Sequence, residues 1–168
     1  MATLTSERIW DILEEIKDPE IPVVSVVEMG LIRSVGLEGK SVGLEGKKII
    51  VVMTPTFAGC PALDVIQREI DRHIRSAGAQ DVEVKMTYSP PWSSNWILPE
   101  GRRKLKEFGL APPPRHKDDI QSALLEEVTC PYCDSRQTTL KNSFGPTLCR
   151  AIYYCNNCHQ PFEQFKPL

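Results

Sequence analysis

Four cysteines near the C-terminus form the most specific chemical pattern in the chain. Cys130 and Cys133 make one C-x2-C pair, Cys155 and Cys158 make a second, and 21 residues separate the pairs. Two such pairs supply four thiolates to one ion and complete a closed tetrahedral zinc site. Because a closed site has no open coordination position, we predict structural zinc without catalysis. An iron site with the same ligands is the alternative.

The segment around these pairs supports a structural metal. About 40 residues are too few to fold by apolar burial alone, so a metal staple is expected. Residues 126–168 carry four acidic and four basic side chains, and four thiolates around a divalent ion add negative charge. This balance argues against nucleic-acid binding, which needs an excess of positive charge.

Two further residues of this segment have ambiguous roles. Cys149 lies outside both pairs, and three interpretations stay open: a buried apolar residue, a replacement ligand or a second reactive thiol. His159 directly follows a ligand and competes in principle for the metal, although four cysteines already complete the shell.

A different kind of site is suggested by Cys60, in the stretch 54–62, Thr-Pro-Thr-Phe-Ala-Gly-Cys-Pro-Ala. Gly59 allows a sharp turn and Pro61 suits the first position of a helix, which places Cys60 at a helix N-terminus. Amide N–H groups and the helix dipole there favour the thiolate, the form that binds metals. The alternative is that Cys60 is a small buried apolar residue.

The elements that position these cysteines follow from hydrophobic periodicity. The stretch 54–62 lies between an apolar β-branched run, 49–53, and a helical pattern, 63–76. A stretch with Trp92 and Trp96 caps the core. The basic residues of the last helix form a solvated face, with a docking surface for an acidic partner as the alternative. The other expected elements are a helix beginning at Thr5 or Ser6, a hairpin of 31–35 with 48–54, a strand 81–88 and a helix 100–108.

These elements predict an α+β protein. A small α/β sandwich domain, with helices on a three-stranded mixed sheet, is followed by a small four-cysteine zinc-ribbon domain. The run Pro112-Pro113-Pro114 and the charges after it read as a linker. We therefore predict domains at 1–111 and 126–168, joined by a linker at 112–125.

The predicted hairpin contains a perfect tandem repeat, because residues 34–40 and 41–47 are both Ser-Val-Gly-Leu-Glu-Gly-Lys. Two short copies do not make a repeat architecture. An odd insertion within paired strands would reverse the facing of the side chains, so the extra copy should bulge at the hairpin tip. We assign it no function.

Composition limits the function classes. The chain has 168 residues, a net charge of -2 and six cysteines, with no signal peptide and no apolar run near the roughly 20 residues that span a bilayer. A cytoplasmic location is expected, with cysteines as thiols or metal ligands. No catalytic triad order, phosphate loop or dinucleotide fingerprint appears, so we predict that the protein is not an enzyme.

Several segments resemble a known family. Asp-Pro-Glu-Ile-Pro at 18–22, Met-Gly-Leu-Ile at 29–32, the stretch 54–62 and Pro-Pro-Trp at 90–92 resemble the small α/β domain of SufT-like iron–sulfur assembly factors. With the ribbon and its ending at 154–166, the chain resembles the PaaD family, one component of the bacterial phenylacetyl-CoA epoxygenase system of phenylacetate degradation. The duplicated heptad departs from this resemblance.

The resemblance implies an accessory protein that helps to mature the epoxygenase. Its implied partners are the iron–sulfur reductase and di-iron oxygenase subunits, and Cys60 is the implied contact for transient iron or an iron–sulfur cluster. Residues that would support this contact are Asp18, Thr54, Thr56, Gly59, Pro61 and Trp92. Because a cluster usually takes four protein ligands, a homodimer or a client would complete the shell. A structural subunit of the complex and a zinc-ribbon adaptor remain alternatives.

Overall fold

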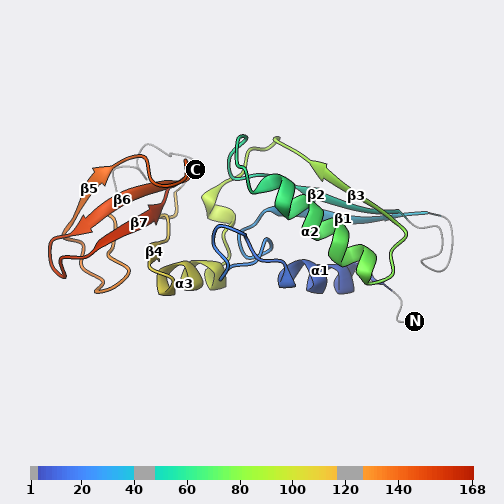
Figure 1. Cartoon of the computed structure of the whole chain (residues 1–168), viewed down its shortest axis with the longest axis horizontal. Helices are drawn as coiled ribbons and strands as arrows, with labels where there is room; N and C mark the ends of the chain where they lie inside the picture. Colours follow the sequence, from blue (N-terminus) through green and yellow to red (C-terminus); the bar gives the residue numbers. More distant parts are fainter. Residues whose placement is uncertain (1–3, 40–47, 117–126) are drawn as a thin grey trace. The chain divides into compact units, whose positions relative to one another are not determined.

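The chain forms two compact units, Met1–Trp92 and Ser93–Leu168 (Figure 1). The computed structural model describes residues 4–39, 48–116 and 127–168. Within these ranges, no helix is both long and apolar enough to cross a membrane. Each unit contains its own sheet, of three and four strands respectively.

The first unit begins with helix α1 (Ser6–Glu15), close to the predicted start. Thr5 is the N-cap, and its hydroxyl accepts a hydrogen bond of 3.2 Å from the backbone N–H of Arg8. One face of the helix is buried, through Ile9, Ile12 and Leu13. The first helix therefore begins where the sequence predicts.

The sheet of this unit has the predicted mixed topology. Strand β1 (Ile32–Glu38) pairs antiparallel with β2 (Lys48–Met53), and β2 pairs in parallel with β3 (Asp81–Met86). The parallel pair is joined by helix α2 (Leu63–Ser76), which lies along the sheet (Figure 1). Alternate β2 residues are fully buried, as expected for a sheet covered by helices, namely Ile49, Val51 and Met53.

Helix α2 buries the predicted apolar stripe, Leu63, Ile66, Ile70 and Ile74. Its C-terminus is followed by Gly78 with φ of +107°, a conformation that favours glycine. Its start differs from the prediction, because Ala62 is the N-cap and Pro61 precedes the helix. Ala62 already has helical backbone angles (φ -69°, ψ -18°), and the helix itself begins at Leu63.

The predicted bulge of the duplicated heptad lies largely outside the described residues, which end at Gly39 and resume at Lys48. The hairpin that carries it is confirmed up to this point, because Glu38 pairs with Lys48 at the end of the ladder. The pair Glu38 and Lys48 is thus the last pair of the ladder that the structure describes.

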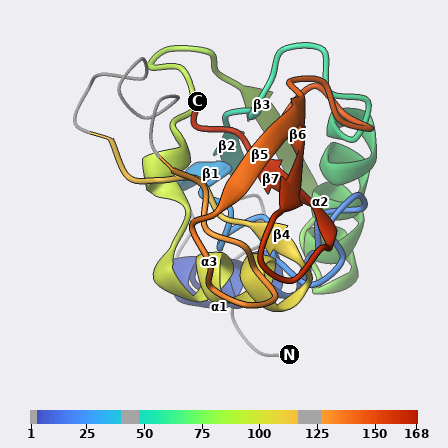
Figure 2. The ribbon, with the colours of Figure 1, turned by 90° about the vertical axis from the view of Figure 1, so that its left-hand side faces the viewer.

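The second unit contains a four-stranded sheet in the order β4-β7-β6-β5 (Figure 2). Strands β5 (Thr138–Asn142), β6 (Arg150–Cys155) and β7 (Pro161–Phe165) pair antiparallel. The short strand β4 (Leu110–Ala111) pairs in parallel with β7. The core of this sheet consists of Ala111, Val128, Cys130, Cys155 and Phe162.

The same unit includes the segment from the short helix η1 (Ser94–Trp96) through α3 (Pro99–Glu107) to β4. Lys106 forms an ion pair with Asp134, and the Tyr132 side chain lies against Gly109. Because of contacts of this kind, the segment belongs to the second unit, and the two units meet after Trp92. Composition instead places the division after residue 111. The predicted limits 1–111, 112–125 and 126–168 stay a prediction.

One basic residue of α3 departs from the expected solvated face. Arg102 is half-buried and donates hydrogen bonds to the backbone carbonyls of Ser94 (2.7 Å), Ile97 (3.3 Å) and Pro113. Its burial lowers the pKa of the guanidinium to about 10, with a smaller effect from the nearby charge of Arg115. Arg102 therefore fixes the backbone around α3, and is not part of a solvated face.

Candidate metal centre

The four cysteines of the two C-x2-C pairs converge on one point. Their Sγ atoms all lie within 4.8 Å of one another, with 3.7 Å between Cys130 and Cys158 and 3.6 Å between Cys133 and Cys155. A tetrahedral zinc ion with Zn–S bonds of about 2.3 Å requires sulfur atoms about 3.8 Å apart. The four thiols therefore fit a structural metal such as zinc.

Both C-x2-C pairs use the same backbone turn. Asp134 and His159, which follow the second cysteine of each pair, have φ of 57° and 60°. In each turn the N–H of this residue donates to the carbonyl of the first cysteine, Cys130 or Cys155, at 3.0 Å. Left-handed backbone is unusual for residues other than glycine, although Asp and His are among those that adopt it. The C-x2-C pattern alone did not reveal these turns.

Hydrogen-bond donors surround one thiol of the site. The Cys133 sulfur accepts from the backbone N–H of Ser135 and, at 3.6 Å, from the side-chain amide of Asn157, and these donors lower the pKa of the thiol to about 6. Burial has the opposite effect on Cys130 and raises its pKa. Because metals bind thiolates, the donors at Cys133 prepare this ligand for binding.

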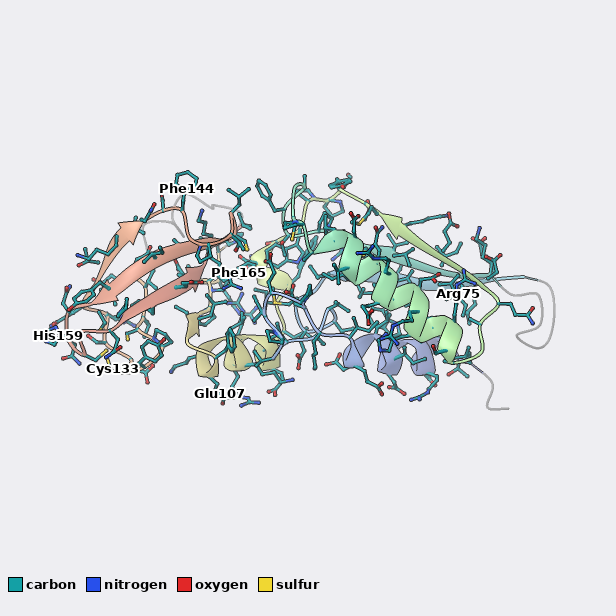
Figure 3. All side chains as sticks on the ribbon, in the orientation of Figure 1. Arg75, Glu107, Cys133, Phe144, His159 and Phe165 are labelled. Carbon is teal, nitrogen blue, oxygen red and sulfur yellow. The ribbon has the colours of Figure 1, made fainter. Side chains whose placement is uncertain are left out.

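The two remaining candidates of this region lie outside the four-sulfur group. His159 and Cys133 lie near the same end of the ribbon (Figure 3), but the His159 Nδ1 atom lies 3.4 Å from the hydroxyl of Tyr154. Cys149 is buried, and its Sγ atom lies 3.1 Å from the hydroxyl of Thr147. Among the described residues, the metal-ligating group contains neither of them.

Cys60 lies in the other unit, in the loop between β2 and α2, and is half-buried. Its N–H donates to the carbonyl of Phe57 at 3.2 Å, and its own carbonyl accepts from the N–H of Leu63 at 3.3 Å. The backbone of Cys60 therefore closes the loop and leads into the first residue of α2. The thiol lies just before the helix, close to the position predicted.

The loop residues around Cys60 differ in exposure. Thr54 is fully buried, Thr56 is half-buried, and Gly59 and Pro61 are exposed. The Thr54 hydroxyl has no hydrogen-bond partner in the part of the chain that the structure describes. A buried polar atom without a partner costs about 1–3 kcal/mol. The Thr54 hydroxyl is therefore an unsatisfied buried polar group of this loop.

The predicted reason for Gly59 is wrong. Its φ is not in the positive range, and an added Cβ would lie 3.6 Å from the Phe57 ring, an ordinary contact. The turn is made by the hydrogen bond between Cys60 and Phe57, which does not depend on glycine.

Asp18 and Trp92 shape the fold of the first unit. One Asp18 carboxylate oxygen accepts from the N–H groups of Glu20 (2.7 Å) and Ile21 (3.0 Å), which fixes the turn after α1. Trp92 is buried, and its indole N–H donates to the carbonyl of Met29 at 3.1 Å. This contact supports the interpretation of Trp92 as part of the core.

Comparisons with known proteins define the class. Residues 6–86 match the family described as iron–sulfur cluster assembly protein, and residues 114–166 match the PaaD zinc beta ribbon domain. A solved structure of a conserved hypothetical protein from Thermotoga maritima is similar, with 28% identity and a TM-score of 0.51, over 62% of this chain and 98% of that one. The class is thus an iron–sulfur-assembly-type domain followed by a zinc ribbon.

The relatives identify the family within this class. The chain is 37% identical to a putative subunit of 1,2-phenylacetyl-CoA epoxidase from Escherichia coli (strain K12), over 95% of this chain and 91% of that protein. It is 34% identical to the Fe-S protein maturation auxiliary factor of Porphyromonas gingivalis (strain ATCC BAA-308 / W83), over 60% of this chain and 90% of that protein. The chain belongs to the PaaD family, which confirms the resemblance found in the sequence.

Proposed function

We propose that this protein is an accessory maturation factor for phenylacetyl-CoA epoxidase, acting in the cytoplasm during phenylacetate degradation, and that it is not itself an enzyme. The observation that carries the proposal is the division of the cysteines. Four of them form a closed set in the ribbon, while Cys60 lies on a loop of the iron–sulfur-assembly-type domain. The names of the two relatives support both the pathway and the maturation role.

Cys60 is the proposed contact for iron or an iron–sulfur cluster in transit. A half-buried thiol just before a helix is accessible, and the first N–H groups of the helix favour its thiolate. The buried Thr54 hydroxyl at the start of the same loop offers a further polar group. These features suit a site that binds a metal and then releases it.

One cysteine in each chain does not complete the ligand shell of a cluster, which usually has four protein ligands. The missing ligands would come from a client or from a second copy of this chain. We propose the iron–sulfur reductase and di-iron oxygenase subunits of the epoxidase as clients. The ribbon would stabilise its own unit through zinc and take no part in the transfer.

A second candidate function is a structural subunit that positions other subunits of the epoxidase. The name of the Escherichia coli relative, which calls that protein a subunit, favours this alternative. Stoichiometric co-purification with the active complex would support it. A zinc-ribbon adaptor without any iron role is the third alternative, and it predicts that Cys60 is dispensable.

The test is the metal and sulfide content of anaerobically purified protein, compared among wild type, Cys60→Ser and Cys149→Ser. Cys149 is the matched control, since it also lies outside the four-cysteine group. We expect about one zinc per chain in all three proteins. Iron and sulfide should be present in wild type and Cys149→Ser and be absent from Cys60→Ser.

The same variants should then replace the wild-type protein in cells that grow on phenylacetate. Cys60→Ser should leave epoxidase subunits that lack iron, whereas Cys149→Ser should support normal iron content. If Cys60→Ser matures the epoxidase as well as wild type does, the proposed role of this thiol is wrong.

A further inference from the structure

The tip of the β5–β6 hairpin exposes large apolar side chains. Phe144 is 64% exposed, Leu148 53% and Leu140, on β5, 49%. Lys166 contacts both Phe144 and Leu148, because its Nζ atom lies 5.1 Å from the centre of the Phe144 ring and donates to the Leu148 carbonyl at 2.9 Å. We call the surface formed by Phe144, Leu148 and Lys166 the hairpin tip.

Backbone hydrogen bonds hold the hairpin tip in place. The N–H of Phe144 donates to the side-chain oxygen of Asn142 at 2.9 Å, and the N–H of Gly145 donates to the Arg150 carbonyl at 2.9 Å. The N–H of Lys166 donates to the Cys149 carbonyl at 2.9 Å. Because the tip is already ordered, little further conformational entropy is lost when a partner binds to it.

The charge around the hairpin tip is positive. Residues 135–162 contain no Asp or Glu, but they contain Arg136, Lys141 and Arg150. Arg150 is paired with Glu163 at 2.9 Å, and the Nζ atom of Lys141 lies 5.3 Å from the centre of the Tyr154 ring, next to the ligand Cys155. Lys166 forms no ion pair within the described ranges. The tip therefore combines exposed apolar surface with the ammonium group of Lys166, which pairs with no carboxylate of the described residues.

The negative charge of the four-cysteine site has little effect at the tip. Strand β6 runs from Arg150, beside the tip, to the ligand Cys155, a length of about 17 Å at 3.3 Å for each residue. Figure 3 shows Phe144 and Cys133 toward opposite ends of the ribbon. The separation is about twice the screening length of about 8 Å at physiological ionic strength.

We propose that the hairpin tip binds an acidic, apolar segment of another protein. Carboxylates of the segment would meet the ammonium group of Lys166, while its apolar side chains cover Phe144 and Leu148. Addition of a strand to the edge of β5 is a poorer fit, because the ladder is irregular between Leu140 and Asn142. The expected binding does not depend on a role in metal transfer.

The first experiment uses the full-length, zinc-loaded protein and an array of short synthetic peptides that combine Asp or Glu with Leu or Phe. Matched arrays carry Asn or Gln, or Lys or Arg, in place of the acids. The tightest acidic peptide is then titrated by fluorescence anisotropy against wild type, Phe144→Ala and Lys166→Gln. The control is Phe108→Ala, which removes a phenylalanine of the same unit that is 48% exposed.

We expect acidic peptides to bind more tightly than both matched sets, and binding to weaken with added salt. Phe144→Ala should weaken binding about tenfold or more, as for a central interface aromatic, and Lys166→Gln should reduce the salt dependence. Phe108→Ala should bind like wild type. Zinc content and circular dichroism, unchanged in each variant, would exclude unfolding as the cause.

Other outcomes would overturn the proposal. Binding of neutral peptides as tight as that of acidic ones would remove the role of charge, and absence of binding across the array would remove the site. Binding of a DNA or RNA oligonucleotide that depends on Phe144 would assign the tip to nucleic acid. A monomer–dimer equilibrium abolished by Phe144→Ala would assign it to a second copy of this chain.

Discussion

The four-cysteine site and the Cys60 loop both present cysteine thiols, but they differ in how many thiols they bring together. In the ribbon, Cys130 and Cys155 are fully buried in the core, and four sulfur atoms complete one shell. In the loop, a single half-buried thiol precedes a helix. A complete set of four thiolates, two of them fully buried, holds a metal permanently, whereas a single half-buried thiol would suit exchange. The difference between the two sites therefore lies in ligand number and access.

The largest expected effect distinguishes a structural thiol from an exchangeable one. Cys155→Ser removes a buried ligand, and structural zinc contributes about 10–16 kcal/mol to the folding of small zinc domains. We expect loss of zinc and loss of hydrogen-exchange protection in β5, β6 and β7, with the first unit unchanged. Cys60→Ser should change the free energy of unfolding of its unit by less than about 0.5 kcal/mol. Retained protection of the ribbon without metal would contradict the structural role.

A smaller effect is expected at Trp92, which separates core packing from a role in the Cys60 loop. Trp92→Phe removes the indole N–H that bonds to the Met29 carbonyl, and a buried acceptor without its donor costs about 1–3 kcal/mol. Urea unfolding of the first unit should show this loss, while iron content stays that of wild type. Loss of iron without loss of stability would show instead that Trp92 supports iron binding at the Cys60 loop.

Two glycines provide a matched pair, one in each unit. Gly78 has φ of +107° with open space around it, whereas Gly109 has φ of +88° and an added Cβ would lie 2.8 Å from the Tyr132 hydroxyl. Alanine in left-handed backbone costs about 1–2 kcal/mol. We expect this loss for Gly78→Ala, and a larger one for Gly109→Ala because Tyr132 must also move. Thermal unfolding would measure both, and equal losses would show that Tyr132 moves at no cost.

The smallest effect is expected in the Cys60 loop. Gly59→Ala should change the free energy of unfolding by less than about 0.5 kcal/mol, since its Cβ makes only an ordinary contact with Phe57. Iron binding measured on the same protein would then report on access to Cys60 alone. A loss above about 1 kcal/mol would show that this loop needs glycine for its backbone after all.

Much of this molecule follows from local sequence patterns. The apolar residues of α2 recur at helical spacing from Leu63 to Ile74, and the structure buries all four of them. The zinc-ribbon prediction depended on two C-x2-C pairs, whose short spacing fixes where the thiols point. In both regions the decisive information lies within a few consecutive residues.

The features that the sequence did not predict depend on distant or unusual partners. Strand β4 has two residues and exists because β7, about 50 positions later, pairs with it. In the sequence Arg102 is one member of a basic run. In the structure it is half-buried, because it donates hydrogen bonds to backbone carbonyls before and after α3. Asp134 and His159 adopt left-handed turns usually assigned to glycine. Strand pairing, side-chain burial and left-handed backbone of this kind cannot be recognised from the few residues around each position.

The pairing of Glu38 with Lys48 has a consequence for the evolution of chain length. The second copy of the heptad, 41–47, lies entirely between these two residues in the sequence. Its deletion would leave Gly39 and Lys40 between the strands, a two-residue connection with glycine in the first position, as type II′ turns require. Shortening the connection between the paired residues from nine residues to two would change the closure free energy of a flexible chain by only about 1 kcal/mol. We therefore expect this hairpin to accept the gain or loss of one repeat, or an inserted affinity tag, with a small change in the free energy of unfolding.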